Sequence, residues 1–180
     1  ILRAKLSLGQ EVDIVSKYLP LYTNVTPTRQ YFLDMTRHTP RDFFQLLAFV
    51  QRHHKSGRMT EPEVKAGLRD YSKKYFQFEI HDELSGYTKI EDINSFFSAI
   101  SAVGKKELSY NELAGAWISE RGEGSENNLN SICKTMYDCS AIGNVENIGK
   151  NTFFTFKHRN RMTNFSKGKM IMLHKGLWKS

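Results

Sequence analysis

At 180 residues the chain is long enough for one large domain or two small ones, and its 39% hydrophobic and 12% aromatic content is ordinary for a folded protein. Four prolines and no low-complexity run argue against long disorder, and no apolar stretch approaches the roughly 20 residues of a membrane span, so no membrane partner is expected. The net charge of +7 makes polyanions the partners to consider.

The start of the chain predicts short helices. Residues 1–8 have the pattern of a helix end, which favours a fragment whose helix began earlier. Residues 11–18 predict a short helix that Pro20 ends, and Thr26 with Pro27 opens another.

The next predicted helix, residues 40–55, has the most distinctive start. Thr39 is a suitable N-cap, Pro40 takes the first helical position, and the charge of Asp42 suits the helix dipole. Arg41 is the odd residue, because a cation in the first turn opposes the dipole. It lies beside helix N–H groups that would attract an anion such as a phosphate. The alternative is a solvent-facing arginine that pairs with a nearby acid.

A long helix is predicted from residue 60 to about residue 85. Thr60 and Glu63 match a capping box at its start, and Gly86 ends it. Apolar residues follow at spacings of four and three and are predicted as core: Val64, Leu68, Tyr71, Tyr75 and Phe78. Residues 1–86 are therefore predicted to form a small helical bundle.

Residues 87–180 predict strands as well as helices. A helix over residues 90–103, preceded by a capping-box pattern at residues 88–91, leads to a short strand at 106–108 and a capped helix from Ser109. The sequence then predicts a turn at residues 121–125, a helix at 126–138 and two strands at 141–147 and 152–158. A closing segment at residues 170–178 is predicted to pack back as a strand or short helix. This is the order of a winged helix-turn-helix domain with a β-hairpin wing, so the fold class is mainly α.

The two cysteines do not predict a disulfide or a metal site. Cys133 and Cys139 are six residues apart on a predicted helix, which does not put them on one face. Reduced buried thiols and the lack of a visible signal peptide suit a cytoplasmic protein.

The basic residues are concentrated at the end of the chain. From residue 147 onwards there are eight Lys or Arg and no Asp or Glu, against 18 basic and 19 acidic residues before it. This asymmetry favours nucleic acid as a partner, and the alternative is a solubilising surface. The candidate phosphate contacts are Lys150, Lys157, Arg159, Arg161, Lys167 and Lys169.

The predicted helix over residues 126–138 has little charge to hold it in a DNA groove. Asn127 and Asn130 could hydrogen-bond base edges, but Lys134 is its one cation. This pattern favours backbone contact by the wing over sequence reading by the helix, and it equally suits a protein-interaction module.

Catalytic motifs are missing from the sequence. There is no phosphate-binding loop, no H-E-x-x-H, no G-x-S-x-G and no C-x-x-C. The chain alone is therefore not expected to be an enzyme, and no catalytic residue or metal ligand is assigned.

Two short segments carry a family resemblance: T-R-H-T-P-R-D at residues 36–42 and H-K-G-L-W-K at residues 174–179. With the order of helical bundle and winged helix, they resemble the C-terminal part of bacterial AAA-type and STAND-type P-loop ATPases. The resemblance implies that residues 1–86 are an ATPase lid and that Arg41 matches the lid arginine that reaches toward the terminal phosphate. The nucleotide-binding core has no counterpart in the sequence, so ATP and Mg²⁺ are expected only where such a core is present.

Three functions remain as hypotheses. The first is a non-catalytic regulatory fragment of a P-loop ATPase, whose winged helix binds duplex DNA non-specifically, or binds the ATPase core or another protein. The second is a stand-alone winged-helix transcriptional regulator, and the third is a protein-interaction adaptor.

Overall fold

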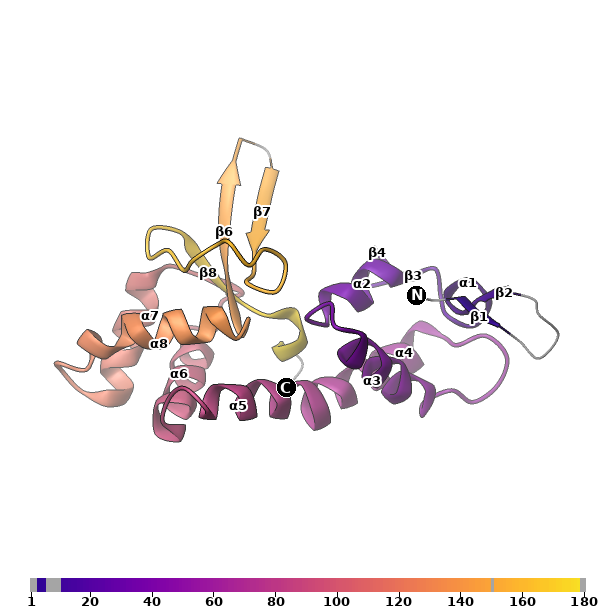
Figure 1. Ribbon diagram of the computed structural model, residues 1–180, viewed down its shortest axis with the longest axis horizontal. Helices are drawn as coiled ribbons and strands as arrows, with labels where there is room; N and C mark the ends of the chain where they lie inside the picture. The colour runs from indigo at the N-terminus through magenta and orange to yellow at the C-terminus, as the bar shows by residue number, and fades with distance from the viewer. Residues whose placement is uncertain (1–2, 6–10, 150, 179–180) are drawn as a thin grey trace. The chain divides into compact units, whose positions relative to one another are not determined.

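The computed structural model describes residues 3–5, 11–149 and 151–178 (Figure 1). The fold is mainly helical with small antiparallel sheets. The chain divides into two compact units, which we call unit 1 (residues up to 77) and unit 2 (residues 78–178). The division lies at the start of helix α5, earlier than the predicted boundary at Gly86, because α5 packs mainly with the later part of the chain.

Unit 1 begins with short strands, so the prediction of an all-helical first half is wrong. Strand β1 (Arg3–Lys5) pairs antiparallel with β2 (Glu11–Asp13), where helix was expected. The register sets Arg3 opposite Asp13 and Lys5 opposite Glu11. Strands β3 (Tyr22–Thr23) and β4 (Thr26–Pro27) form a second hairpin.

Four helices of unit 1 lie close to the positions that the sequence predicts for helices. They are α1 (Ile14–Tyr18), α2 (Thr28–Asp34), α3 (Pro40–Gln51) and α4 (Glu61–Tyr71). The predicted N-cap of α3 is confirmed, since Thr39 Oγ1 accepts from the Asp42 N–H at 3.1 Å. The Thr60–Glu63 capping box of α4 is confirmed as well.

Helices α3 and α4 approach each other closely at Gly67. A Cβ atom at this position would lie 2.5 Å from the Cα of Val50 and 3.0 Å from the Phe49 carbonyl oxygen, so only glycine fits. Around this contact the two helices bury Phe43, Leu46, Val64 and other apolar residues of the unit 1 core.

A π-helical turn (Ser72–Phe76) comes after α4 and changes the register of the predicted apolar stripe. A π turn takes more residues than an α turn, so the residues after it rotate to a different face. Phe76 is consequently fully buried, and Phe78, predicted as core, is 62% exposed.

Unit 2 contains three helices after α5 (Gln77–Ser85): α6 (Ile90–Val103), α7 (Tyr110–Arg121) and α8 (Glu126–Asp138). Each of these three helices has a buried apolar face, on which lie Phe96, Trp117 and Leu129 respectively. Helix α8 has the predicted bounds. The capping box predicted before α6 is wrong, because the N-cap position is Lys89 and carries no side-chain cap.

The sheet of unit 2 is antiparallel, in the order β5-β8-β6-β7. Its strands are β5 (Glu107–Leu108), β6 (Ile142–Ile148), β7 (Asn151–Thr155) and β8 (Met170–Leu173). The predicted β6–β7 hairpin is confirmed, although its strands extend to Ile148 and Asn151 and leave a shorter loop than expected.

A 3₁₀ turn (Lys175–Leu177) closes the last strand. The buried imidazole of His174 accepts from the Gly176 N–H at Nδ1, at 3.0 Å. Leu177 is buried, and the Trp178 Nε1–H donates to the Leu173 carbonyl oxygen at 2.8 Å.

The start of α7 is held by a carboxylate that makes unit 2 sensitive to acid. Glu112 accepts from the Ser109 N–H at 2.7 Å and also binds Lys105 and the Ser109 hydroxyl. The bond from Lys105, followed by those from Ser109, lowers the pKa of Glu112 to about 2. Because this pKa is depressed in the folded state, the stabilisation is complete above the ordinary value of 4.5 and is lost as the pH falls toward about 2.

Replacing Glu112 by glutamine should therefore lower the stability of unit 2 at neutral pH, and the difference from the wild type should shrink as the pH falls from about 4.5 to about 2. Urea midpoints followed by tryptophan fluorescence measure this, because Trp117 and Trp178 both lie in unit 2. Glu123→Gln, which removes an exposed carboxylate outside any helix, is the control. A difference that stays constant over this pH range would contradict the role given to the Glu112 carboxylate.

Candidate nucleic-acid interface

Helix α8 exposes a polar face and buries an apolar one. Asn127 is exposed and Asn130 is half-buried, so both predicted base-contacting residues reach the surface of this helix. Leu129, Ile132 and Met136 form part of the opposite, buried face. Cys133 lies on that face too, and its burial raises the pKa of the thiol to about 12, so it remains protonated and unreactive at neutral pH.

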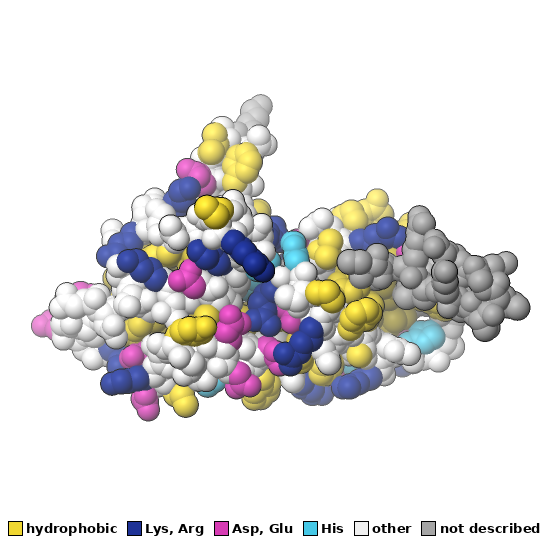
Figure 2. Space-filling model, in the orientation of Figure 1, with side chains coloured by type: hydrophobic (Ala, Val, Ile, Leu, Met, Phe, Trp, Pro, Cys, Tyr) yellow, Lys and Arg dark blue, Asp and Glu magenta, His cyan; other side chains and the backbone are white. Residues whose placement is uncertain are grey.

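The β6–β7 hairpin, which we call the ribbon, extends away from the helices of unit 2 (Figure 1). Its base is buried, with Val145 packed against Phe156 and Met172. Toward its end, apolar side chains face solvent at Ile148, Phe153 and Phe154. In Figure 2, apolar side chains are visible on the ribbon, with Lys and Arg side chains around its base.

The segment between β7 and β8, residues 156–169, is fixed to its neighbours by hydrogen bonds; we call it the basic loop. Buried Asn144 of β6 donates to the Ser166 carbonyl oxygen at 3.0 Å and accepts from the Ser166 N–H at 2.9 Å. The hydroxyl of Tyr137 on α8 donates to Thr163 Oγ1 at 2.8 Å. The loop therefore has a defined position beside both α8 and the ribbon.

Two of the predicted phosphate contacts are used inside unit 2. The Lys157 ammonium donates to the Thr163 carbonyl oxygen at 2.8 Å and lies 3.5 Å from an Asp138 carboxylate oxygen. Lys169 pairs with Glu146 of the ribbon at 2.6 Å. These bonds organise the basic loop, and the sequence offered no sign of them because the acidic partners lie far from each lysine in the chain.

Three other cations of the basic loop face solvent. Arg159, Arg161 and Lys167 are all exposed. The Arg159 guanidinium lies 5.9 Å from the Phe156 ring centroid, and the Lys167 ammonium lies 4.8 Å from that of Tyr110. Lys150, the remaining predicted contact, falls outside the described residues. The exposed set is thus concentrated on one loop that contains no acidic residue.

Arg41, the candidate from unit 1, is exposed in the first turn of α3, with its guanidinium 5.9 Å from the Tyr75 ring centroid. The neighbouring acid, Asp42, is fully buried and pairs with a different arginine. Arg37 donates to Asp42 Oδ2 from Nε at 3.0 Å and from its backbone N–H at 3.1 Å, and the Tyr75 hydroxyl donates to Oδ1 at 3.3 Å. Arg37 was not predicted as a partner of Asp42, because the five-residue separation across a turn follows no helical spacing.

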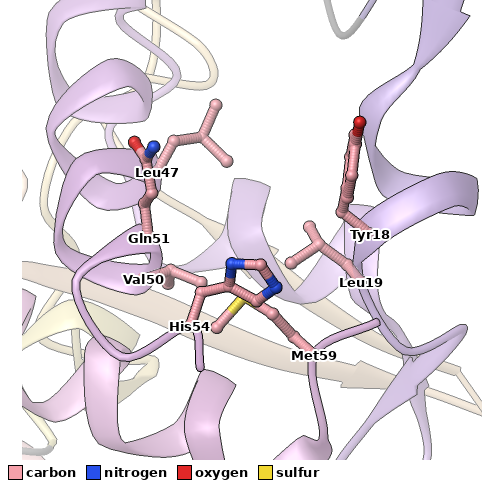
Figure 3. Close-up of a pocket in the computed structure, with 7 residues that line it drawn as sticks. All are labelled: Tyr18, Leu19, Leu47, Val50, Gln51, His54 and Met59. Carbon is pink, nitrogen blue, oxygen red and sulfur yellow. The ribbon is translucent and has the colours of Figure 1, made fainter. Parts of the chain in front are cut away.

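Unit 1 also contains an apolar pocket of about 380 Å³ between α1, α3 and the segment before α4. Figure 3 shows Leu19, Val50 and Met59 around its interior, the polar groups of Tyr18 and Gln51 at its edges, and the His54 ring next to Met59. The His54 ring is held by a 2.8 Å bond to the Gly57 carbonyl oxygen. These residues do not form a nucleophile–base pair or a cluster of acids.

No protein-family model matches the chain, and neither a curated protein nor a solved structure is significantly similar to it. Within the described part of the chain, no group of three or more His, Cys, Asp or Glu side chains could hold a metal ion. In the same part, no helix is both long and apolar enough to cross a membrane. The geometry and charge of unit 2 therefore carry the functional proposal.

Proposed function

We propose that unit 2 is a cytoplasmic winged-helix module that binds duplex DNA through its phosphates, with little sequence preference. In this proposal α7 and α8 form the helix-turn-helix, and the ribbon is the wing. The order α6, β5, α7, α8, β6, β7 supports this assignment.

One observation carries the proposal: Arg159, Arg161 and Lys167 are exposed on an acid-free loop that is fixed beside α8 and the ribbon. Phosphate contacts from arginine and lysine supply most of the affinity in non-specific DNA binding. The polar but weakly charged face of α8 supports backbone contact rather than reading of bases.

We further propose that unit 1 is the lid of a P-loop ATPase and that the chain is its non-catalytic regulatory part. One feature of the α3 start supports an anion-sensing role for Arg41: Arg37 pairs with Asp42 and so compensates the negative charge beside Arg41. ATP and Mg²⁺ enter this proposal only together with a nucleotide-binding core.

The test is a salt titration of fluorescence anisotropy with a random-sequence duplex. We expect a dissociation constant of ~10⁻⁴–10⁻⁶ M at physiological salt. Three phosphate contacts predict that log K falls against log salt with a slope of roughly −2.7, and that Arg161→Gln reduces its magnitude by about 0.9. Lys73→Gln, an exposed cation of unit 1, is the matched control and should leave the slope unchanged.

The other functions give different results in the same titration. Tight binding to one sequence that depends on Asn127 or Asn130 would favour a stand-alone transcriptional regulator. A lack of binding even at low salt would contradict DNA binding and favour a protein-interaction adaptor.

A further inference from the structure

The ribbon presents apolar side chains on both of its faces. Successive residues of a strand point to opposite sides, so Phe153 and Phe154 lie on different faces. They are 49% and 43% exposed, respectively. Ile148, 58% exposed, lies on the same face as Phe153, because Ile148 is opposite Asn151 and side chains two residues apart share a face.

This distribution fits a wedge better than a flat contact. A partner with one flat surface would cover either Phe153 or Phe154 and leave the other in water. A ribbon inserted between two groups would cover both. The one acidic side chain of the ribbon, Glu146, is opposite Phe153 and is paired with Lys169, so its charge is compensated.

The chemistry around the ribbon indicates the kind of group between which it inserts. The strand β7 leads directly into the basic loop, where Arg159, Arg161 and Lys167 are exposed. A partner that contacts both the ribbon and the basic loop must combine negative charge with flat apolar groups. Nucleic acid with unpaired bases has this combination, because aromatic side chains stack on bases while cations hold the phosphates.

We propose that the ribbon binds unpaired bases at the junction between duplex and single-stranded DNA. Phe153 and Phe154 stack on bases on either side of the wedge, and the exposed cations of the basic loop hold the adjoining duplex. This inference rests on the proposed DNA-binding function and deepens it, since it names the form of DNA that unit 2 prefers.

The experiment compares a forked duplex with a blunt duplex of equal nucleotide number by fluorescence anisotropy. Loss of one stacking partner corresponds to roughly 5- to 150-fold in affinity. We expect the wild type to prefer the fork at least fivefold, and we expect Phe153→Ala and Phe154→Ala each to reduce that preference. Phe78→Ala, which truncates another exposed phenylalanine, on α5, should retain the preference for the fork.

A 2-aminopurine base at the fork gives an independent readout, because stacking of Phe153 or Phe154 changes its fluorescence. Phe153→Trp should preserve both the fork preference and this signal, and unchanged tryptophan fluorescence in the alanine variants shows that they fold. Equal affinity for fork and blunt duplex would overturn the wedge while leaving the proposed function intact. Absence of binding to either DNA would overturn both and point to a protein partner for the ribbon.

Discussion

Replacing Asp42 by alanine is expected to lower the free energy of unfolding of unit 1 by about 3 kcal/mol. Removing one member of a buried ion pair typically costs about 3–5 kcal/mol, because the remaining charge is left without compensation. The Asp42 side chain is 0% exposed and the Arg37 side chain is 15% exposed. We place the expected loss at the lower end of the range because Arg37 retains some access to water.

Urea unfolding followed by far-UV circular dichroism measures this loss. Asp34→Ala is the control, since Asp34 is a partly exposed carboxylate that accepts a bond from Gln30 within the same helix, and it should cost about 1 kcal/mol or less. Replacing both partners, as Arg37→Met with Asp42→Leu, should recover part of the loss, because it removes the uncompensated guanidinium. The backbone N–H of residue 37 and the Tyr75 hydroxyl still lose their acceptor, so recovery is incomplete. Equal losses from Asp42→Ala and Asp34→Ala would show that the buried ion pair contributes no more to the free energy of unfolding than a partly exposed carboxylate.

Replacing Gly67 by alanine is expected to destabilise unit 1 by about 1–3 kcal/mol, the usual cost of overpacking. Alanine would otherwise favour a helix by about 1 kcal/mol relative to glycine. At Gly67 the added Cβ would lie 2.5 Å from the Cα of Val50, and backbone cannot move aside as a flexible side chain can. Helices α3 and α4 would have to separate.

The matched control is Gly115→Ala, in the middle of α7. A Cβ atom there meets nothing within 4 Å, so this variant should be stabilised by up to about 1 kcal/mol. Opposite signs for the two substitutions in the same urea experiment are the expected result. A stabilised Gly67→Ala variant would contradict the close approach of α3 and α4.

Helices were predictable from the sequence where a polar cap and an apolar face coincide. Thr39, Thr60 and Ser109 each begin a helix as predicted, and the inward face of α8 follows helical spacing. The four short strands of unit 1 were not predictable, because two or three residues cannot establish an alternating pattern. The turn at Asn24 and Val25 gave no signal either, since valine rarely adopts the positive φ of 58° that it has there.

The π-helical turn explains the wrong prediction for Phe78. The apolar spacing before it is α-helical, and nothing in the sequence indicates the change of register after Tyr71. For the candidate interface, composition alone located the basic end of the chain. It could not separate Lys157 and Lys169, which are bonded within unit 2, from Arg161 and Lys167, because that distinction depends on Asp138 and Glu146, which are remote in sequence.

The closing turn after β8 bears on how the H-x-G-L segment can be used in comparing proteins. His174 accepts the Gly176 N–H, Gly176 and Leu177 are buried, and Trp178 bonds back to Leu173. Each of these residues thus has a structural role in ending a sheet. In this chain the architecture alone accounts for the segment, so sharing an H-x-G-L segment is not by itself a reason to transfer an activity between proteins.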